Sequence, residues 1–289
     1  MDIKNALTVD VEDYFQVSAF ARSVSVNDWD NYPARVITNT QRLLKLFEEH
    51  DIKATFFVLG WVAERQPELV REIVNEGHEV ACHGYSHQLI YNQSPEVFKE
   101  ETIRAKSILE DITQQNIRGY RAASYSITQK SSWALDTLAE CGFEYDSSIF
   151  PVRHDRYGMP GTPKTPYVLK TPAGHLIKEF PLSTARILNY YLPIAGGGYF
   201  RLYPYWLSRM GLRQISKESR PFIFYLHPWE IDPEQPRIEA SWASRFRHYN
   251  NLDKCEARLQ KLLDEFAFDT TWNVLNGLEL DKQDIVSVS

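Results

Sequence analysis

The chain has 289 residues, of which 43% are hydrophobic and 24% are charged. It is long enough to bury a sizeable core in one large or two small domains. The formal net charge of −6 argues against a nucleic-acid partner, and the absence of an 18-residue apolar run predicts no membrane span.

The N-terminus and the cysteines indicate the compartment. Met1 is followed within a few residues by a strand-like segment, without the charged and apolar regions of an export signal. We therefore expect a cytoplasmic protein. Cys82, Cys141 and Cys255 are an odd and scattered set, which predicts no disulfide framework.

Strand-like and helix-like segments alternate from residue 6 onward. Short apolar runs predict strands at 6–11, 53–60, 78–83, 117–123 and 143–150. Helical spacing of apolar residues, or helix start and stop signals, predict helices at 38–50, 66–77, 94–112 and 129–142. Pro67 and Pro95 stand in first turns, and Gly77 and Gly142 mark helix ends. These strand–helix units predict parallel strands joined by crossover helices, in an open sheet or a barrel.

The alternation breaks between residues 150 and 200, where prolines are frequent and a triglycine run, 196–198, follows. We interpret this segment as an insertion within the domain, since long irregular stretches are usually functional loops or linkers. Strands at 177–182 and 221–229 and a helix at 251–266 follow.

Polar residues gather where the predicted strands end, and in parallel α/β proteins that edge is where sites are built. Asp10, Glu12 and Asp13 close the first strand. Carboxylates so close to a buried segment need a metal, an arginine or hydrogen bonds. The alternative for this cluster alone is a cap of a helix or turn.

Two histidines follow the third strand. His83 and His87 have the i, i+4 spacing that places two imidazoles on one side of a helical turn, as in zinc sites. Two surface or hydrogen-bonding histidines are the alternative for the pair alone.

Three more polar residues stand at later strand ends. Arg121 is suited to orient a carboxylate, and His227 is a candidate acid or base. Asp146 follows the fifth strand. Taken singly, Arg121 also fits a structural ion pair, and His227 a partly buried structural histidine.

The order of these motifs resembles that of the NodB-homology polysaccharide deacetylases (carbohydrate esterase family 4) over most of residues 6–231. The segments VDVEDYFQVSAF, YDSSIFPVRHDRYG and GGGYFRLYPYW are more narrowly similar to a branch that accompanies exopolysaccharide loci of the exosortase/PEP-CTERM type. The resemblance implies an α/β fold, an irregular (β/α)7 TIM-like barrel over residues 1–231. A C-terminal extension, residues 232–289, would pack on the same domain.

The resemblance also implies an activity. The chain would be a hydrolase of non-peptide carbon–nitrogen bonds that removes N-acetyl groups from an amino-sugar polysaccharide or a saccharide precursor, in exopolysaccharide biosynthesis. It would use a divalent metal, with Zn²⁺ as the first expectation. The implied ligands are His83, His87 and one acid. We favour Asp13 over Glu12, because Asp is the commoner acid in that role and a bulge could turn it inward.

The remaining roles follow from the same resemblance. Asp10 would be the general base, aligned by Arg121. The backbone N–H of Ser124 would stabilise the oxyanion, although Ala123 replaces the proline that the family has before it. His227 would be the general acid, tuned by Asp146.

The loop 154–157 and the triglycine run are predicted to shape the substrate groove. Two alternatives remain for the function. One is a hydrolase of small non-peptide amides on the same fold, whose activity would resist chelators. The other is a non-catalytic carbohydrate-binding protein, which would release no acetate from N-acetyl sugars. The sequence predicts no oligomeric state.

Overall fold

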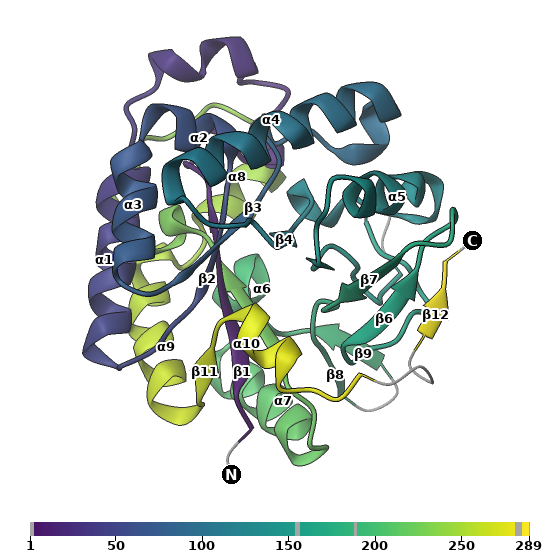
Figure 1. The fold of residues 1–289 in the computed structure, drawn as a ribbon. Helices are drawn as coiled ribbons and strands as arrows, with labels where there is room; N and C mark the ends of the chain where they lie inside the picture. Colours follow the sequence, from purple (N-terminus) through teal and green to yellow (C-terminus); the bar gives the residue numbers. More distant parts are fainter. Residues whose placement is uncertain (1–2, 154–156, 188–189, 281–284, 289) are drawn as a thin grey trace.

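The computed structural model describes residues 3–153, 157–187, 190–280 and 285–288 (Figure 1). Its centre is a ten-stranded sheet with the strand order β10-β1-β2-β3-β4-β5-β7-β6-β12, in which β11 also pairs with β1. The strands from β10 to β7 in this order are parallel, whereas β6 runs antiparallel to β7. A separate hairpin is formed by β8 and β9.

The strands of the central sheet are β1 (Asn5–Val11), β2 (Thr55–Val58), β3 (Glu79–Cys82), β4 (Gly119–Tyr120), β5 (Tyr145–Asp146), β6 (Tyr167–Lys170), β7 (Leu176–Glu179), β10 (Ile223–Leu226), β11 (Phe268–Asp269) and β12 (Ile285–Ser287). The hairpin strands are β8 (Thr184–Ile187) and β9 (Tyr190–Pro193).

The α-helices are α1 (Val36–Glu49), α2 (Gly60–Arg65), α3 (Pro67–Asn75), α4 (Pro95–Thr113), α5 (Trp133–Glu140), α6 (Gly197–Leu202), α7 (Tyr205–Lys217), α8 (Trp242–Tyr249), α9 (Leu252–Glu265) and α10 (Thr271–Asn276). Short 3₁₀ helices are η1 (Ser18–Phe20), η2 (Val26–Asn31), η3 (Ile90–Asn92), η4 (Ala123–Tyr125), η5 (Gln129–Ser131) and η6 (Pro228–Ile231).

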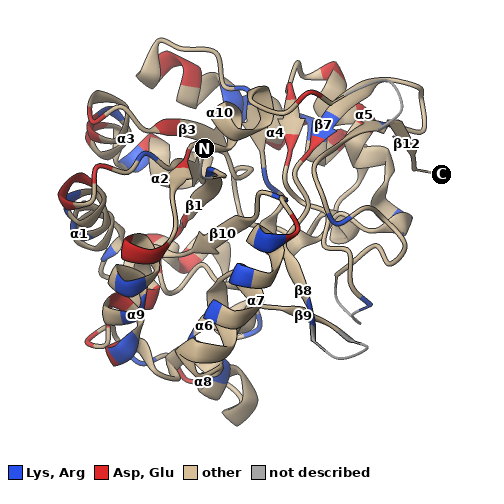
Figure 2. Ribbon diagram, turned by 90° about the horizontal axis from the view of Figure 1, so that it is seen from below, with Lys and Arg blue, Asp and Glu red and all other residues tan. Residues whose placement is uncertain are grey.

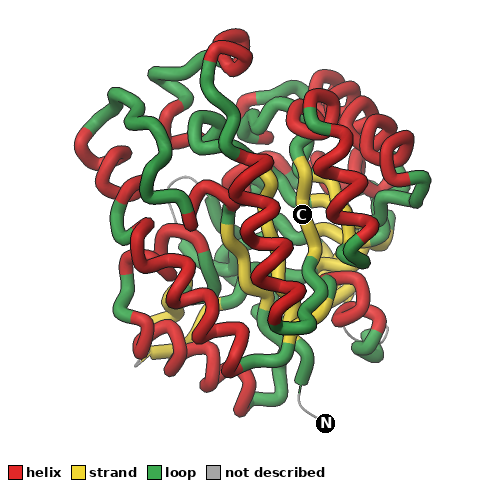
Figure 3. The backbone as a smooth tube through the Cα atoms, turned by 90° about the vertical axis from the view of Figure 1, so that its left-hand side faces the viewer, coloured by secondary structure: helices red, strands yellow, loops and turns green. Residues whose placement is uncertain are grey.

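Helices cover the outer side of the central strands (Figure 3). Every residue of β1, β2 and β10 is buried, because their outer faces carry helices and their inner faces meet the barrel interior. The predicted α/β class with parallel strands is therefore confirmed. The barrel is open, however, since no pairing joins β10 to the edge formed by β6 and β12 within the described residues.

The local signals for helix ends are found in the structure. The Ser94 side chain accepts a hydrogen bond from the backbone N–H of Val97, and Pro95 begins α4. Gly77 and Gly142 have φ values of +79° and +77°, the left-handed conformation that ends a helix.

The segment after residue 150 is more regular than predicted. It contains the antiparallel pair β6–β7 and the hairpin β8–β9, and a 13-residue helix, α7, follows. The apolar pattern of α7 was hidden because its buried face includes Ser208 and Gly211, whereas Trp206 and Met210 are exposed.

The C-terminal residues add strands to the same sheet. Phe268 of β11 pairs with Asn5 of β1, and β12 pairs with β6. The start of α10 is held at the amino ends of the strands, where the Thr271 N–H donates to Thr55 Oγ1 at 2.7 Å. Among the described residues, no helix has both the length and the apolar character needed to cross a membrane.

Candidate active site

The predicted site residues come from the carboxyl ends of neighbouring parallel strands. Asp10 is the penultimate residue of β1, and Glu12 is the first residue after the strand. His83 comes one residue after β3, and Arg121 one residue after β4. His227 follows β10, which pairs with β1. Sheet order thus brings together residues that are distant in the sequence.

Glu12, His83 and His87 form a set of possible metal ligands. Their ligand atoms all lie within 4.8 Å of one another, and Glu12 Oε2 is 2.7 Å from His87 Nε2. His83 Nδ1 lies 2.8 Å from the carbonyl oxygen of Arg121. Because a carbonyl can only accept, Nδ1 carries the hydrogen and Nε2 is left as the ligand atom.

The chemistry of this donor set fits a divalent metal. Burial lowers the pKa of His83 to about 4, so its ring is neutral at pH 7. Burial acts to raise the pKa of Glu12, but His87 and His227 outweigh it and lower that pKa to about 2. Glu12 Oε2 is buried and faces His87 Nε2. A buried carboxylate and two imidazoles are ligands that Zn²⁺ accepts.

The two histidines reach one another through a loop, not the helical turn that their spacing suggested. Gly84 and His87 have φ values of +75° and +53°. A Cβ atom at Gly84 would lie 3.2 Å from the Tyr120 hydroxyl, which also favours glycine there. The His83 and His87 rings are 5.4 Å apart between centroids.

Asp13 does not join the histidines, which corrects our preference for it over Glu12. Its Oδ2 accepts hydrogen bonds from the backbone N–H groups of Arg35 (2.7 Å) and Val36 (2.9 Å), at the start of α1. Its Oδ1 accepts from the N–H of Tyr14 at 2.9 Å. The chain turns sharply after β1, so that Glu12 faces the site and Asp13 faces the helix. The helix-cap alternative therefore describes Asp13.

Asp10 and Arg121 form a buried ion pair. Arg121 Nη1 lies 2.6 Å from Asp10 Oδ1, and both side chains are almost completely inaccessible to solvent. Arg121 Nη1 also donates to Thr8 Oγ1, and its Nε and Nη2 donate to the backbone and side chain of Ser147. The guanidinium is thus held on several sides, and it fixes the Asp10 carboxylate beside the metal-ligand set.

The His227 ring faces Glu12 and Asp10. Its Nε2 is 3.6 Å from Glu12 Oε1 and 3.9 Å from Asp10 Oδ2. Its Nδ1 is 3.1 Å from Glu230 Oε2. Burial acts to lower the pKa of His227, but Glu12 and Glu230 raise it to about 9, so the ring is protonated at neutral pH.

Asp146 is not the partner of His227, contrary to the prediction. Its Oδ1 accepts from the Ser148 hydroxyl at 2.6 Å, and Oδ2 accepts from the Ser148 N–H. It lies beside Glu179 of β7, because β5 and β7 are adjacent and Asp146 pairs with Glu179 in register. Burial raises the pKa values of both carboxyl groups, that of Asp146 to about 6.

The residues that sequence reasoning missed are Glu230 and Arg201. Arg201 is buried, and its Nε donates to Glu230 Oε1 at 2.6 Å. Glu230 stands three residues after His227, and its carboxylate also accepts from the His227 N–H at 3.0 Å. This i, i+3 spacing in a turn was the available signal for Glu230. No local pattern identified Arg201, since it meets Glu230 only through tertiary contact.

Ser124 lies in η4, the turn that follows Arg121, with a φ of +51°. Its hydroxyl is 2.7 Å from that of Ser18, in the segment after β1. The role predicted for its N–H stays a prediction.

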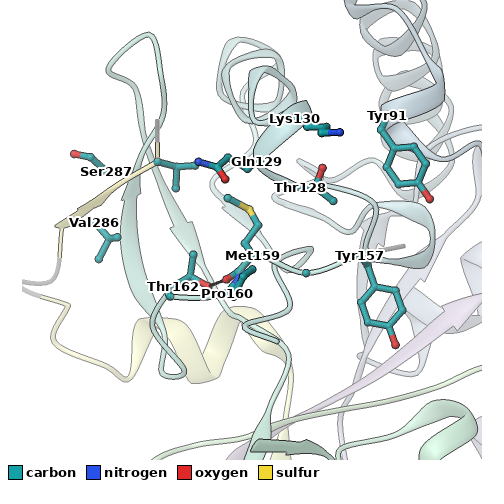
Figure 4. A pocket seen from close by; sticks show the side chains of 13 residues that line it. Tyr91, Thr128, Gln129, Lys130, Tyr157, Met159, Pro160, Thr162, Val286 and Ser287 are labelled. Carbon is teal, nitrogen blue, oxygen red and sulfur yellow. Dashed lines mark hydrogen bonds between the residues drawn. The ribbon is translucent and has the colours of Figure 1, made fainter. Parts of the chain in front are cut away.

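Two hollows bear on the predicted site and groove. One, of about 350 Å³, is lined by His87 and by residues of the segment 15–29. The other, of about 780 Å³, lies between Tyr91 and Tyr157 on one side and Val286 and Ser287 of β12 on the other (Figure 4). Tyr157 is the described member of the predicted groove loop. His154, Asp155 and Arg156 lie outside the described residues.

Comparison with protein families divides the chain near residue 146. Residues 23–145 match the model named polysaccharide deacetylase. Residues 147–276 match a domain of unknown function, DUF3473. The region that matches the deacetylase model contains His83, His87 and Arg121, whereas the region that matches DUF3473 contains His227.

Curated relatives agree with the match of residues 23–145. A peptidoglycan-N-acetylglucosamine deacetylase of Bacillus cereus is 28% identical over 152 residues, which is 47% of this chain and 53% of the relative. A peptidoglycan deacetylase of Helicobacter pylori is 32% identical over 37% of this chain and 36% of its own length. A chitooligosaccharide deacetylase of Bradyrhizobium is 34% identical over 35% of this chain and 43% of its own. The chain thus spans about half or less of these relatives.

Solved structures share the fold over nearly the whole chain. A structure described as a polysaccharide deacetylase from Mycobacterium smegmatis aligns over 100% of this chain and 93% of its own, with a TM-score of 0.66 and 19% identity. A Puue allantoinase aligns over 95% of this chain and 89% of its own, with a TM-score of 0.63 and 15% identity. At such identities the likeness concerns the fold alone.

Proposed function

We propose that this protein is a metal-dependent hydrolase that removes N-acetyl groups from an amino-sugar saccharide. The observation that carries the proposal is the convergence of Glu12, His83 and His87 beside the Asp10–Arg121 pair and a protonated His227. The names of the curated relatives, which include peptidoglycan and chitooligosaccharide deacetylases, support the reaction class.

A divalent metal, which we take to be Zn²⁺, would be held by Glu12, His83 and His87. It would lower the pKa of a bound water and polarise the acetyl carbonyl. Hydrolysis of an amide then needs a group that accepts the proton of the attacking water and a group that donates a proton to the departing amine. Two side chains beside the cluster meet these needs.

Asp10 is the proposed base. Arg121 holds its Oδ1 at 2.6 Å, which leaves Oδ2 to accept the water's proton. His227 is the proposed acid, because its ring is protonated at neutral pH and its Nε2 faces the same space. Ser124 is proposed to stabilise the oxyanion through its backbone N–H, a type of donor that contributes about 3 kcal/mol.

The setting of the reaction is part of the same proposal. We infer that the substrate is a polysaccharide or saccharide precursor of exopolysaccharide biosynthesis and that the enzyme acts in the cytoplasm. The sequence similarity to the exosortase/PEP-CTERM-associated branch supports the first point.

The test is acetate release from N-acetylglucosamine oligomers, measured together with the metal content. We expect wild-type activity to disappear with a chelator and to return with Zn²⁺. Asp10→Asn should keep the metal but lose at least 100-fold in rate, and His83→Ala should lose both. His175→Ala, at an exposed histidine, is the matched control. Unchanged acetate release in Asp10→Asn and His83→Ala would refute the mechanism.

A further inference from the structure

Helix α7 carries an exposed face with an unusual combination of side chains. Trp206 and Met210 lie one turn apart and are 63% and 47% exposed. Arg213 and Lys217 continue the same stripe and are also exposed. These positions are spaced by four, three and four residues, so they lie on one side of a helix, over a length of about 16 Å.

The opposite face of α7 explains why this stripe points outward. Gly211, Leu212 and Ile215 are buried, and a Cβ atom at Gly211 would lie 2.9 Å from Ala185 of β8. Close packing on β8 therefore fixes the rotation of the helix. Trp206 and Met210 are left in solvent by this rotation, which costs free energy unless another surface covers them.

The charge around the stripe is positive, in a protein whose net charge is −6. Helix α7 contains Arg209, Arg213 and Lys217 and no acidic residue, and its ribbon carries several blue segments (Figure 2). Arg186 of β8 lines a hollow of about 550 Å³ together with side chains of α7. Arg209 and Arg213 pair with Glu265. Within the described residues, Arg186 and Lys217 have no carboxylate partner, so the surface retains positive charge.

We propose that this face of α7 docks on an anionic lipid bilayer. Tryptophan is favoured at the boundary between lipid headgroups and acyl chains, and methionine adds apolar area beside it. Long cationic side chains can lie along the surface and reach the phosphates. The combination of an exposed indole with flanking cations fits a lipid surface better than an acidic protein. An acidic protein could bind through the cationic side chains alone, without the exposed indole.

The geometry also suits an enzyme that works while docked. Helix α7 lies outside the barrel and leads into β10, whereas the candidate active site lies at the carboxyl ends of the strands. This inference concerns the outer surface and does not depend on the proposed deacetylase reaction.

The test is co-sedimentation of the full chain with vesicles of two compositions at low salt. We expect binding to vesicles containing phosphatidylglycerol and at least tenfold weaker binding to pure phosphatidylcholine vesicles. Two double variants, Trp206→Ser with Met210→Ser and Arg213→Glu with Lys217→Glu, should each reduce binding at least tenfold. Both should keep the wild-type circular dichroism, because all four side chains are exposed.

Matched control variants distinguish binding through this face of α7 from nonspecific binding to vesicles. Trp242→Ser removes a tryptophan of α8 that is 79% exposed, and Lys254→Glu with Lys261→Glu reverses two exposed charges of α9. These variants should bind like the wild type. The proposal is overturned if the wild type ignores anionic vesicles or if the controls lose as much binding. It is also overturned if loss of Trp206 and Met210 has no effect, since attraction would then be purely ionic and an acidic macromolecule would serve equally.

Discussion

Arg201 and Glu230 act on the candidate acid through a short chain of contacts. Burial acts to raise the pKa of Glu230, but Arg201 and His227 lower it to about 2, so the carboxylate is ionised. That carboxylate accepts from the backbone N–H of His227 and lies 3.1 Å from Nδ1. Arg201 therefore positions Glu230, which in turn orients and charges the imidazole.

We expect Glu230→Gln and Arg201→Ala to lower kcat roughly 10- to 100-fold with little change in KM, because proton donation by His227 is impaired while substrate contacts remain. Arg201→Lys should retain a higher kcat than Arg201→Ala. Steady-state kinetics of acetate release would measure kcat and KM of each variant. Arg258→Ala is the control, since Arg258 holds the backbone carbonyls of the same segment without touching Glu230. An equal loss of kcat in Arg258→Ala would show that Arg201 only stabilises the backbone of α6 and does not act through Glu230.

The buried Asp146–Glu179 pair predicts a pH effect on stability. The pKa of Asp146 is about 6 in the folded protein and near 4 in the unfolded chain, so the folded state binds more protons between these values. Its contribution to stability is therefore lost as pH rises from about 4 to above 6. Other groups titrate in this range, so the difference between wild type and Asp146→Asn is used to measure the contribution of the Asp146–Glu179 pair.

Relative to the wild type, Asp146→Asn should become more stable by about 2 kcal/mol between pH 4.5 and pH 7.5. Urea unfolding of the metal-free proteins at both pH values gives this difference. A constant difference would mean that the pair does not take up a proton on folding.

The identity of the acidic metal ligand could not be predicted from the sequence. The sequence placed Asp10, Glu12 and Asp13 at the edge of the site, and all three are buried there. Which one joins the histidines depends on the turn after β1, in which the Glu12 N–H donates to the Asp10 carbonyl. Sequence periodicity does not encode the direction of a side chain in such a turn.

At the scale of elements, Asp13 connects the end of β1 to the start of α1. It accepts two backbone N–H groups of the helix start, which would otherwise lack partners. We expect Asp13→Ala to lower the free energy of unfolding by about 2 kcal/mol and to keep the metal. Glu12→Gln should instead lose metal affinity at least tenfold with little change in metal-free stability.

Denaturant unfolding and metal titration of the two variants measure these effects separately. Loss of metal in Asp13→Ala, with Glu12→Gln unaffected, would reverse the assignment of the two acids.

Elements with strong local signals were predictable. The helices that begin at Pro67 and Pro95 have both their proline starts and their expected ends. The hairpin β8–β9 and α7 were not, because their pairing partners and buried faces are set by tertiary contacts. Most of the site could be predicted from the polar residues at the strand ends. Neighbouring parallel strands bring these residues together at one edge of the sheet.

At the scale of the whole molecule, the two family regions form one sheet. β1 precedes the matched deacetylase region, and its neighbours are β2 from that region and β10 and β11 from the second. β5 pairs with β7 of the second region. Neither region contains a complete core, and His227 reaches the metal-ligand set only because β10 pairs with β1.

We expect a fragment of residues 1–145 to lack stable structure in β1, because the strand loses its partner on one side. Hydrogen exchange should show slow exchange at Leu7 and Val9 in the full chain and fast exchange in the fragment. Equal protection in both would show that the first region folds alone.

The pairing of β1 with β10 also has a consequence for synthesis. Thr8 bonds to Phe224, 216 residues later in the chain. At about 5–20 residues per second, a ribosome needs roughly 10–40 seconds to make that stretch. During this interval a strand that ends up fully buried has no partner on one edge and remains open to pairing with other nascent chains. Cellular yield should therefore depend on translation rate and on chaperones that cover the first strand until the last ones emerge.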